Sequence, residues 1–215
     1  LPVDHLPRPE LVRLIQDAAH CRLILLCAPA GFGKSTLAAE VAEQLPAHGP
    51  SVWVALGPGD STPAQLLHTL ILGLRTLFPE TGSAELALLS QLHADQPLAI
   101  EAVLADLLAD LQRRYSPRQP VLLILDDYHL VRSTDRLCAL LCENLPTCFQ
   151  ILITSRARPQ YSFARMRVSN QLFELDERHL RVEPDLATTF LKRAGVDATD
   201  TQWLRQRIDR NEGWF

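Results

Sequence analysis

The sequence lacks any apolar stretch long enough to cross a bilayer, since its longest runs, around 23–28 and 121–125, span only a few residues. It also lacks an excess of positive charge, because 21 lysines and arginines stand against 25 aspartates and glutamates. That balance argues against this segment gripping nucleic acid by itself. An apolar leader is missing too, as Asp4, His5 and Arg8 stand among prolines at the start. We therefore expect an ordinary globular protein of the cytoplasm.

Cysteine and methionine are both scarce. The five cysteines form no C-x-x-C pair, which excludes a disulfide framework and a zinc-ribbon pattern. Cys138 and Cys142 stand four apart on an expected helix and could bring two metal ligands together, but we interpret them as buried structural thiols. The one methionine is Met166, so Leu1 is not a translation start. We expect the chain to be a piece of a larger protein.

Strands and helices alternate along the chain. Apolar runs predict strands at 23–27, 51–56, 121–125, 149–154 and 171–175. Amphipathic periodicity predicts helices at 10–18, 35–45, 98–114 and 134–145, with further helices between 62 and 97. This alternation indicates a parallel sheet wrapped on both faces. We expect the fully apolar 121–125 strand to be central and interpret Trp53 and Phe149 as core residues.

The pattern changes after about residue 178. Val182-Glu-Pro-Asp185 opens a helix with proline and acids in its first turn, and a second short helix is expected at 201–210. We therefore predict two units: a nucleotide-binding domain over 1–178 and a helical lid subdomain over 179–215, which we expect to be truncated.

Residues 28–36, Ala-Pro-Ala-Gly-Phe-Gly-Lys-Ser-Thr, form a phosphate-binding loop (P-loop) between an expected strand and an expected helix. Lys34 is expected to bridge β- and γ-phosphate oxygens, Ser35 to bind Mg²⁺, and Thr36 to reach the α-phosphate. Ala28 replaces the first glycine of the motif, at the strand exit where contact with phosphate is least. The residues predicted to bind nucleotide here are Gly31, Phe32, Gly33, Lys34, Ser35 and Thr36.

A second acidic element follows about 90 residues later, where the strand Val121–Leu125 ends in Asp126-Asp127. This order is typical of a Walker B element, in which Asp126 would hold Mg²⁺ through water. Asp127 would then orient or deprotonate the attacking water. His129 could serve as a general base, but the two carboxylates already meet that need.

The strand Ile151–Thr154 ends in Ser155-Arg156. In a parallel sheet ligands bind at the carboxyl edge of the strands, so Arg156 is predicted to read the γ-phosphate. The predicted catalytic residues are Lys34, Asp127 and Arg156. Together these elements predict a P-loop NTPase sandwich that binds ATP or ADP with Mg²⁺.

With these motifs in hand, the chain resembles the ATPase module of the MalT-like, LuxR-type transcriptional activators in the STAND class of signalling NTPases. The resemblance is carried by the segments Leu6-Pro-Arg-Pro-Glu-Leu11, Ala28–Ser35, Leu125-Asp-Asp-Tyr-His-Leu130, Leu152-Ile-Thr-Ser-Arg156, Leu180-Arg-Val-Glu-Pro184 and Asn211-Glu-Gly-Trp214. The Asp-Asp-Tyr-His-Leu and Glu-Gly-Trp segments are the more specific ones.

The resemblance implies a switch in which ADP holds the protein closed, while ATP and an inducer open it and drive self-association. It implies an ASCE/STAND-type sheet, slow hydrolysis, an unidentified small-molecule inducer, and DNA binding only through a C-terminal domain outside these residues. It also implies that Leu6 and Arg8 lie near the adenine and that 180–215 covers the nucleotide. No membrane partner is expected.

Two other classes stay open. A metabolic P-loop kinase would need an acceptor site and an arginine-rich lid, and 157–170 contains Arg158, Arg165 and Arg167. An AAA-type motor would need an arginine that acts on a neighbouring subunit.

Overall fold

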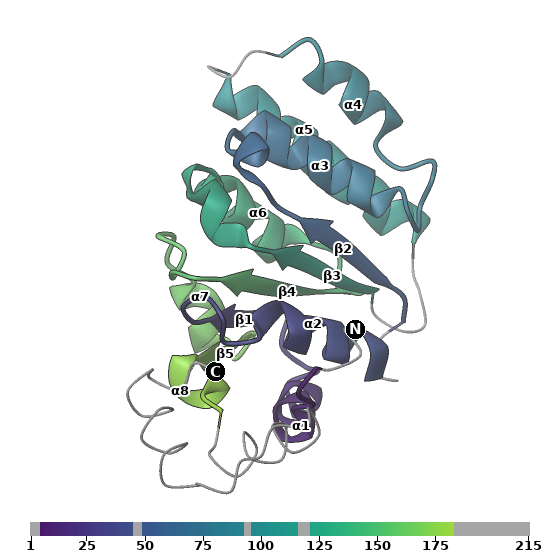
Figure 1. Ribbon diagram of the computed structural model, residues 1–215. Coiled ribbons are helices and arrows are strands. Elements are labelled where there is room, and N and C mark those ends of the chain that lie inside the picture. The colour runs from purple at the N-terminus through teal and green to yellow at the C-terminus, as the bar shows by residue number, and fades with distance from the viewer. Residues whose placement is uncertain (1–4, 45–48, 93–95, 116–120, 183–215) are drawn as a thin grey trace, which may run out of the picture.

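The protein is an α/β sandwich around a five-stranded parallel sheet (Figure 1). The computed structural model describes residues 5–44, 49–92, 96–115 and 121–182 of the chain. The strands lie in the order β2-β3-β4-β1-β5, and every neighbouring pair is parallel. They are β1 (Leu23–Cys27), β2 (Ser51–Ala55), β3 (Val121–Asp126), β4 (Phe149–Ser155) and β5 (Leu172–Asp176).

Helices cover both faces of the sheet, as Figure 1 shows. α1 and α2 lie on one face, α3, α5 and α6 lie on the other, and α4 packs outside against α3 and α5. The expected three-layer sandwich is confirmed. The helices are α1 (Pro9–Asp17), α2 (Lys34–Gln44), α3 (Pro63–Leu74), α4 (Ser83–Leu89), α5 (Pro97–Arg114), α6 (Asp135–Asn144), α7 (Ala164–Val168) and α8 (Glu177–Leu180), with 3-10 helices η1 (Pro58–Asp60) and η2 (Tyr128–Thr134).

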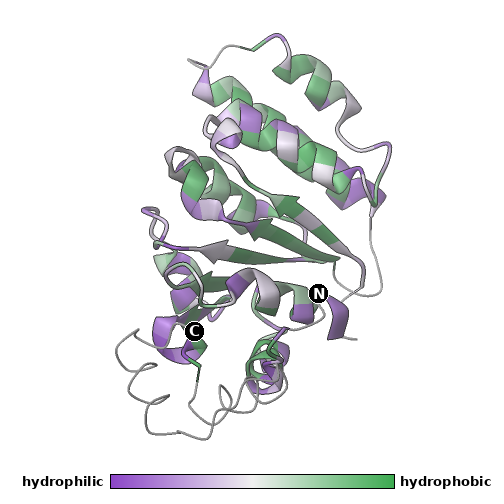
Figure 2. Cartoon of the chain, viewed as in Figure 1, coloured by the Kyte–Doolittle hydropathy of each residue, from purple (hydrophilic) through white to green (hydrophobic). Residues whose placement is uncertain are grey.

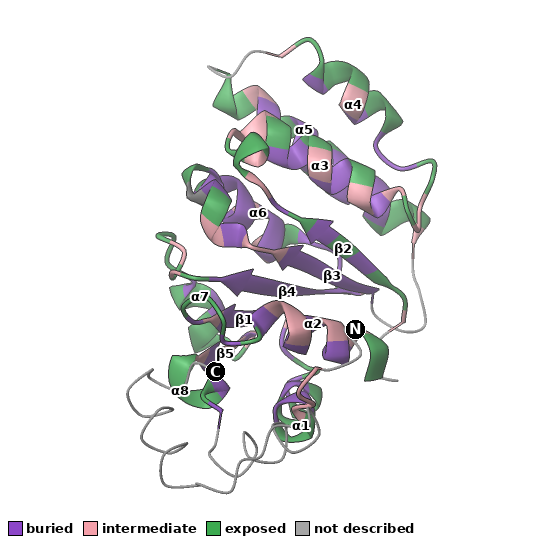
Figure 3. Cartoon of the chain, in the orientation of Figure 1, coloured by how far each residue is buried: buried purple, intermediate pink, exposed green. Residues whose placement is uncertain are grey.

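Alternation along the strands divides the core into two clusters. On β3, Leu123 and Leu125 join the cluster under α3, α5 and α6, whereas Leu122 and Ile124 join the cluster under α1 and α2. Both faces of the strand are therefore apolar, which is why the sequence shows a continuous run there. Figure 2 shows the sheet as mostly hydrophobic and Figure 3 shows it as mostly buried. The polar residues at the strand ends thus lie on a rigid support.

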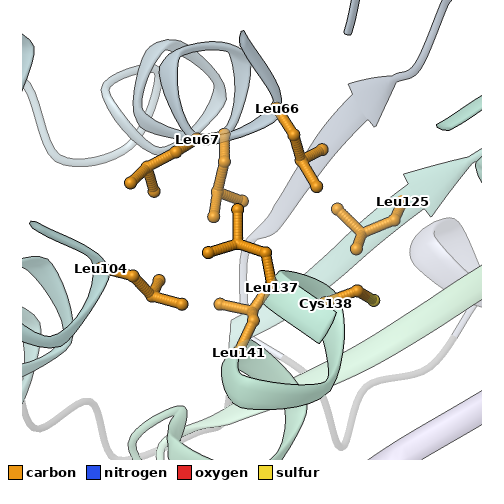
Figure 4. Close-up of a pocket in the computed structure, with 8 residues that line it drawn as sticks. Leu66, Leu67, Leu104, Leu125, Leu137, Cys138 and Leu141 are labelled. Atoms are coloured by element: carbon orange, nitrogen blue, oxygen red, sulfur yellow. The ribbon is translucent and has the colours of Figure 1, made fainter. Parts of the chain in front are cut away.

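A small cavity of about 10 Å³ remains between α3, α5, α6 and β3 (Figure 4). Seven leucines and one cysteine line it: Leu66, Leu67, Leu70, Leu104, Leu125, Leu137, Cys138 and Leu141. A space of that size lined only by apolar side chains is expected to stay dry. Cys138 therefore serves as a small apolar core residue.

Two sequence expectations need correction, and two short helices were not anticipated. The middle strand is β4, and β3 lies between it and the edge strand β2. Trp53 on β2 is 39% exposed, because only the Val52 and Val54 face of this edge strand is covered. The short helices α7 and α8 were not predicted. Phe149 is a core residue as expected, and the helices expected after residue 182 lie outside the described residues.

Candidate phosphate site

Three segments far apart in the sequence meet at the carboxyl edge of the sheet. β1 leads into the P-loop, β3 ends at Asp126, and β4 ends at Ser155. β4 lies between the other two strands, so its last residues stand between the P-loop and the acidic pair. Ligands of open parallel sheets bind in this position.

The P-loop is shaped by two glycines with left-handed backbone angles. Gly31 has φ 85° and Gly33 has φ 72°, which glycine adopts without the steric cost that a Cβ imposes. α2 starts directly afterwards at Lys34, so the free N–H groups of its first turn point toward the loop. Phe32 is buried in the cluster with α1 and α2 and fixes the loop to the domain. The sequence therefore folds locally into the loop-to-helix turn that is typical of phosphate-binding loops.

Lys34 is drawn into this loop, where its Nζ donates to the carbonyl oxygen of Pro29 at 2.7 Å. Burial lowers the pKa of Lys34, and the positive charge of Arg156 lowers it further. Asp127 acts in the opposite direction. An ammonium group that is buried among mixed charges gains from an added anion, so phosphate is the ligand this environment favours.

Asp126 accepts two hydrogen bonds on one oxygen. Ser35 Oγ donates to Asp126 Oδ1 at 2.8 Å, and Thr154 Oγ1 donates to the same atom at 2.5 Å. Ser35 belongs to the P-loop helix and Thr154 to β4, so this carboxylate joins all three segments. The sequence pointed to hydroxyl groups at the end of β4 but not to this positioning contact of Thr154.

Asp127 is held in an unusual backbone conformation, with φ 59°. Few residues adopt this angle, and aspartate and asparagine do so more readily than most. Its N–H donates to Thr154 Oγ1 at 2.9 Å, which stabilises the turn. The Asp127 side chain is 42% exposed, so its carboxylate reaches the solvent side of the site.

His129 and Arg156 complete the charged surroundings. His129 Nδ1 lies 3.6 Å from Asp127 Oδ1 and makes no hydrogen bond among the described residues. Burial lowers the pKa of His129, with Arg156 adding to the effect and Asp127 opposing it. Arg156 itself is exposed, and its charge acts on both Lys34 and His129. A mostly neutral imidazole thus stands beside the second carboxylate.

The N-terminal segment lies against α2 and not inside the P-loop. The backbone N–H of Arg8 donates to Glu40 Oε2 at 3.0 Å, and its guanidinium donates to the carbonyl oxygens of Leu180 and Arg181 at 3.0 and 3.2 Å. Glu40 is fully buried, and His5 Nε2 lies 3.5 Å from its Oε1. Leu6 is partly buried in the same segment. The described contacts of Arg8 therefore link α2 to the end of α8.

Sequence reasoning overlooked Glu40, although a signal existed. Glu40 follows Leu37 by three residues and precedes Val41, so it lies beside the apolar stripe of α2. A carboxylate in that place needs a partner, since burying one alone is costly.

The donor set fits Mg²⁺. Ser35 Oγ and Asp126 Oδ1 are hard oxygen donors that already meet at the start of α2, and Mg²⁺ prefers few protein oxygens together with substrate phosphates. Among the described residues no group of three or more His, Cys, Asp or Glu side chains could hold a metal. Cys138 and Cys142 both lie buried in the apolar cluster under α3, α5 and α6.

The strand order and the P-loop define this chain as a P-loop NTPase. The profile of a family described as "AAA domain" matches residues 16–164, and the chain belongs to that family. Within the described residues, no helix is long and apolar enough to span a membrane.

Relatives confirm the resemblance to the MalT-like regulators. The HTH-type transcriptional regulator MalT of Vibrio parahaemolyticus is 27% identical over 211 residues, covering 96% of this chain and 22% of the relative. The serine/threonine-protein kinase PknK of Mycobacterium tuberculosis is 30% identical over 213 residues, covering 96% of this chain and 18% of the relative. The chain thus spans about a fifth of the length of these curated relatives.

The fold recurs in solved structures. A chain of the E. coli MS115-1 HORMA:CdnC:Trip13 complex matches with a TM-score of 0.52 at 11% identity, covering 94% of this chain and 74% of that chain. At this identity the likeness concerns the fold alone.

Proposed function

We propose that this chain is the ATP- and ADP-binding switch module of a MalT-like transcriptional regulator, with slow Mg²⁺-dependent hydrolysis of ATP. The observation that carries the proposal is the hydrogen bond between Ser35 Oγ and Asp126 Oδ1 at 2.8 Å. It brings together the two groups that would hold Mg²⁺ in a P-loop enzyme.

Each residue has a distinct part in this proposal. The backbone N–H groups of 31–36 cradle the phosphates, and Lys34 neutralises the β- and γ-oxygens. Ser35 and Asp126 would hold Mg²⁺, which when bound supplies charge neutralisation on the transferring phosphoryl group. Asp127 orients the attacking water, and Arg156 reads the γ-phosphate. Burial lowers the pKa of His129, which favours the neutral imidazole and leaves the Asp127 carboxylate available to the water.

The switch role is supported by the contacts of Arg8. A nucleotide can shift a conformational equilibrium only if it binds two states with different affinity. Arg8 connects α2, which starts at the phosphates, with 180–181, where the predicted lid begins. We propose that 1–178 forms the nucleotide-binding domain, that 179–215 forms the start of the lid, and that Leu6 and Arg8 approach the adenine.

The relatives support a module of general use. The same stretch of about 210 residues recurs in proteins named as a transcriptional regulator and as a protein kinase. A segment that is shared by proteins with different named activities is better explained as a nucleotide switch than as the part that carries out either activity. In the whole protein we propose cytoplasmic location, self-association upon activation, response to a small inducer, and DNA binding through a separate C-terminal domain.

Calorimetric titration with Mg-ATP and Mg-ADP tests this proposal. The unaltered chain should bind both, and Lys34→Ala should lower the affinity for each by tenfold or more, since a buried charge-assisted contact contributes about 1.5–3 kcal/mol. Ser35→Ala should weaken the Mg²⁺-dependent part of binding and leave metal-free binding less changed. Arg13→Ala, which removes a cation from an exposed position on α1, is the matched control. Equal binding by the Lys34 and Arg13 variants, or none by the unaltered chain, would contradict the site.

A further inference from the structure

A buried carboxylate outside the phosphate site accepts hydrogen bonds from two segments that each carry a residue of that site. Asp135, the first residue of α6, is 9% exposed. Its Oδ1 accepts the hydroxyl of Tyr128 at 2.7 Å, and its Oδ2 accepts the backbone N–H of Gln160. The two partners are separated by 32 residues and belong to different segments of the site. Asp135 is therefore the common support of two loops.

The hydrogen bond from Tyr128 to Asp135 helps to position Asp127, the residue directly before Tyr128. Tyr128 is fully buried and directly follows the residue whose backbone has φ 59°. The turn is thus held twice, by Thr154 at the N–H of Asp127 and by Asp135 at the hydroxyl of Tyr128. Burial raises the pKa of Tyr128, so its hydroxyl stays protonated and remains a donor.

The hydrogen bond from Gln160 to Asp135 holds the loop that contains Arg156. The loop after β4 is anchored near its start, where Ser155 Oγ donates to the carbonyl oxygen of Ala157 at 2.5 Å, and again at Gln160 by Asp135. Arg156 lies within the Ser155–Ala157 turn, four residues before Gln160. Its own side chain is exposed, so the backbone on either side of it limits where the guanidinium can reach.

We propose that Asp135 is a positioning residue that sets the separation between Asp127 and Arg156 across the phosphate site. One carboxylate oxygen holds the turn that carries the water-orienting acid, and the other holds the loop that carries the γ-phosphate sensor. A shift of either loop would misplace one group relative to the other, and misplacement by about 1 Å can cost up to about a hundredfold in rate. This role rests on the proposed nucleotide function of the same site.

Two substitutions test the support from its two ends. Tyr128→Phe removes one hydroxyl from a buried ring and keeps its shape. Asp135→Leu keeps a similar size and removes both acceptor oxygens, so both links break. Tyr161→Phe is the matched control for the first, because the hydroxyl of this exposed tyrosine lies 3.4 Å from Glu143. Asp110→Leu is the control for the second, since Asp110 is also 9% exposed and bonds Arg114 on α5.

The measurements are the Kd for Mg-ATP, the single-turnover rate of hydrolysis, and the ratio of the Kd values for Mg-ADP and Mg-ATPγS. Both test variants should keep the Kd for Mg-ATP within about threefold and lose about tenfold or more in hydrolysis rate. The ADP-to-ATPγS ratio should move toward one in Asp135→Leu, which also releases the loop that carries Arg156, and should stay unchanged in Tyr128→Phe, which keeps the Gln160 link. Both controls should match the unaltered chain.

The outcomes separate the two proposals. If the unaltered chain binds no nucleotide, the proposed function fails and the positioning role fails with it. If it binds nucleotide and the test variants match their controls in rate and in ratio, the positioning role alone is overturned. Should hydrolysis be too slow to measure, the ratio decides. Should Asp135→Leu fail to fold, the hydrolysis rate of Tyr128→Phe decides, and a loss of affinity for Mg-ATP in proportion to the loss of rate in that variant would overturn the positioning role.

Discussion

Replacing Glu40 by glutamine should release the N-terminal segment from α2. The carboxylate is fully buried and accepts the N–H of Arg8 at 3.0 Å. A hydrogen bond to a charged group contributes about 1.5–3 kcal/mol and a neutral one about 0.5–1.5 kcal/mol, so the loss should be about 1–1.5 kcal/mol. We expect this loss to act on local opening of the segment more than on global unfolding.

Hydrogen exchange measures that opening directly. The amides of Arg8 and Val12, the latter bonded to the Arg8 carbonyl at 3.0 Å, should exchange about tenfold faster in Glu40→Gln. Glu43→Gln, an exposed change on the same helix, should leave both rates unaltered. Trypsin should also cleave faster after Arg181, since Arg8 holds its carbonyl oxygen. Equal rates in the two variants, or faster exchange spread evenly over the sheet, would refute the reasoning.

Two further substitutions and one labelling experiment have defined outcomes. Gly82→Ala should cost about 2–4 kcal/mol in urea unfolding, because φ is 73° and the new Cβ would lie 2.4 Å from an isoleucine on α3; Gly59→Ala, with open space around it, should cost less than about 0.5 kcal/mol. Burial lowers the pKa of His129 from its ordinary value of 6.5. The unfolded chain therefore takes up this proton at a higher pH than the folded chain, and the free energy of unfolding falls as the pH drops below about 6.5. His129→Asn should flatten this part of the stability profile, and an unchanged slope would contradict the assignment. Cys138 and Cys142 are buried, and the pKa of Cys142 is raised by its contact with Cys138 and by burial, so a thiol reagent should label them only as the protein unfolds; rapid labelling of the folded protein would count against this.

Much of the fold was predictable because its signals are local. Leu23–Cys27 and Val121–Leu125 read as strands since parallel strands buried on both faces are apolar throughout. The glycines of the P-loop were equally readable, because Gly31 and Gly33 adopt angles that other residues avoid. In these cases the residue type itself indicates the local backbone conformation, so the sequence alone is enough to predict it.

Other features depend on neighbours that are remote in sequence. Trp53 is as apolar as a core residue, but its exposure follows from the edge position of β2, which only the strand order reveals. Asp135 looks like a helix-capping acid until the loop after β4 comes within reach. Glu40 and Arg8 are 32 residues apart, and Arg8 and Leu180 are 172 apart. Such pairings are set by tertiary packing, so the sequence pattern alone could not supply them.

The contacts of Arg8 bear on how this protein is handled in the laboratory. A cloning boundary drawn at the first regular helix, Pro9, would delete a residue that bonds both α2 and the 180–181 segment. The shortened chain would keep the entire P-loop and both acidic residues. Its calorimetric signal for nucleotide could then survive while any response of the C-terminal part was lost, and the two measurements would disagree. Fusion partners are accordingly better joined well ahead of His5, with a spacer between them.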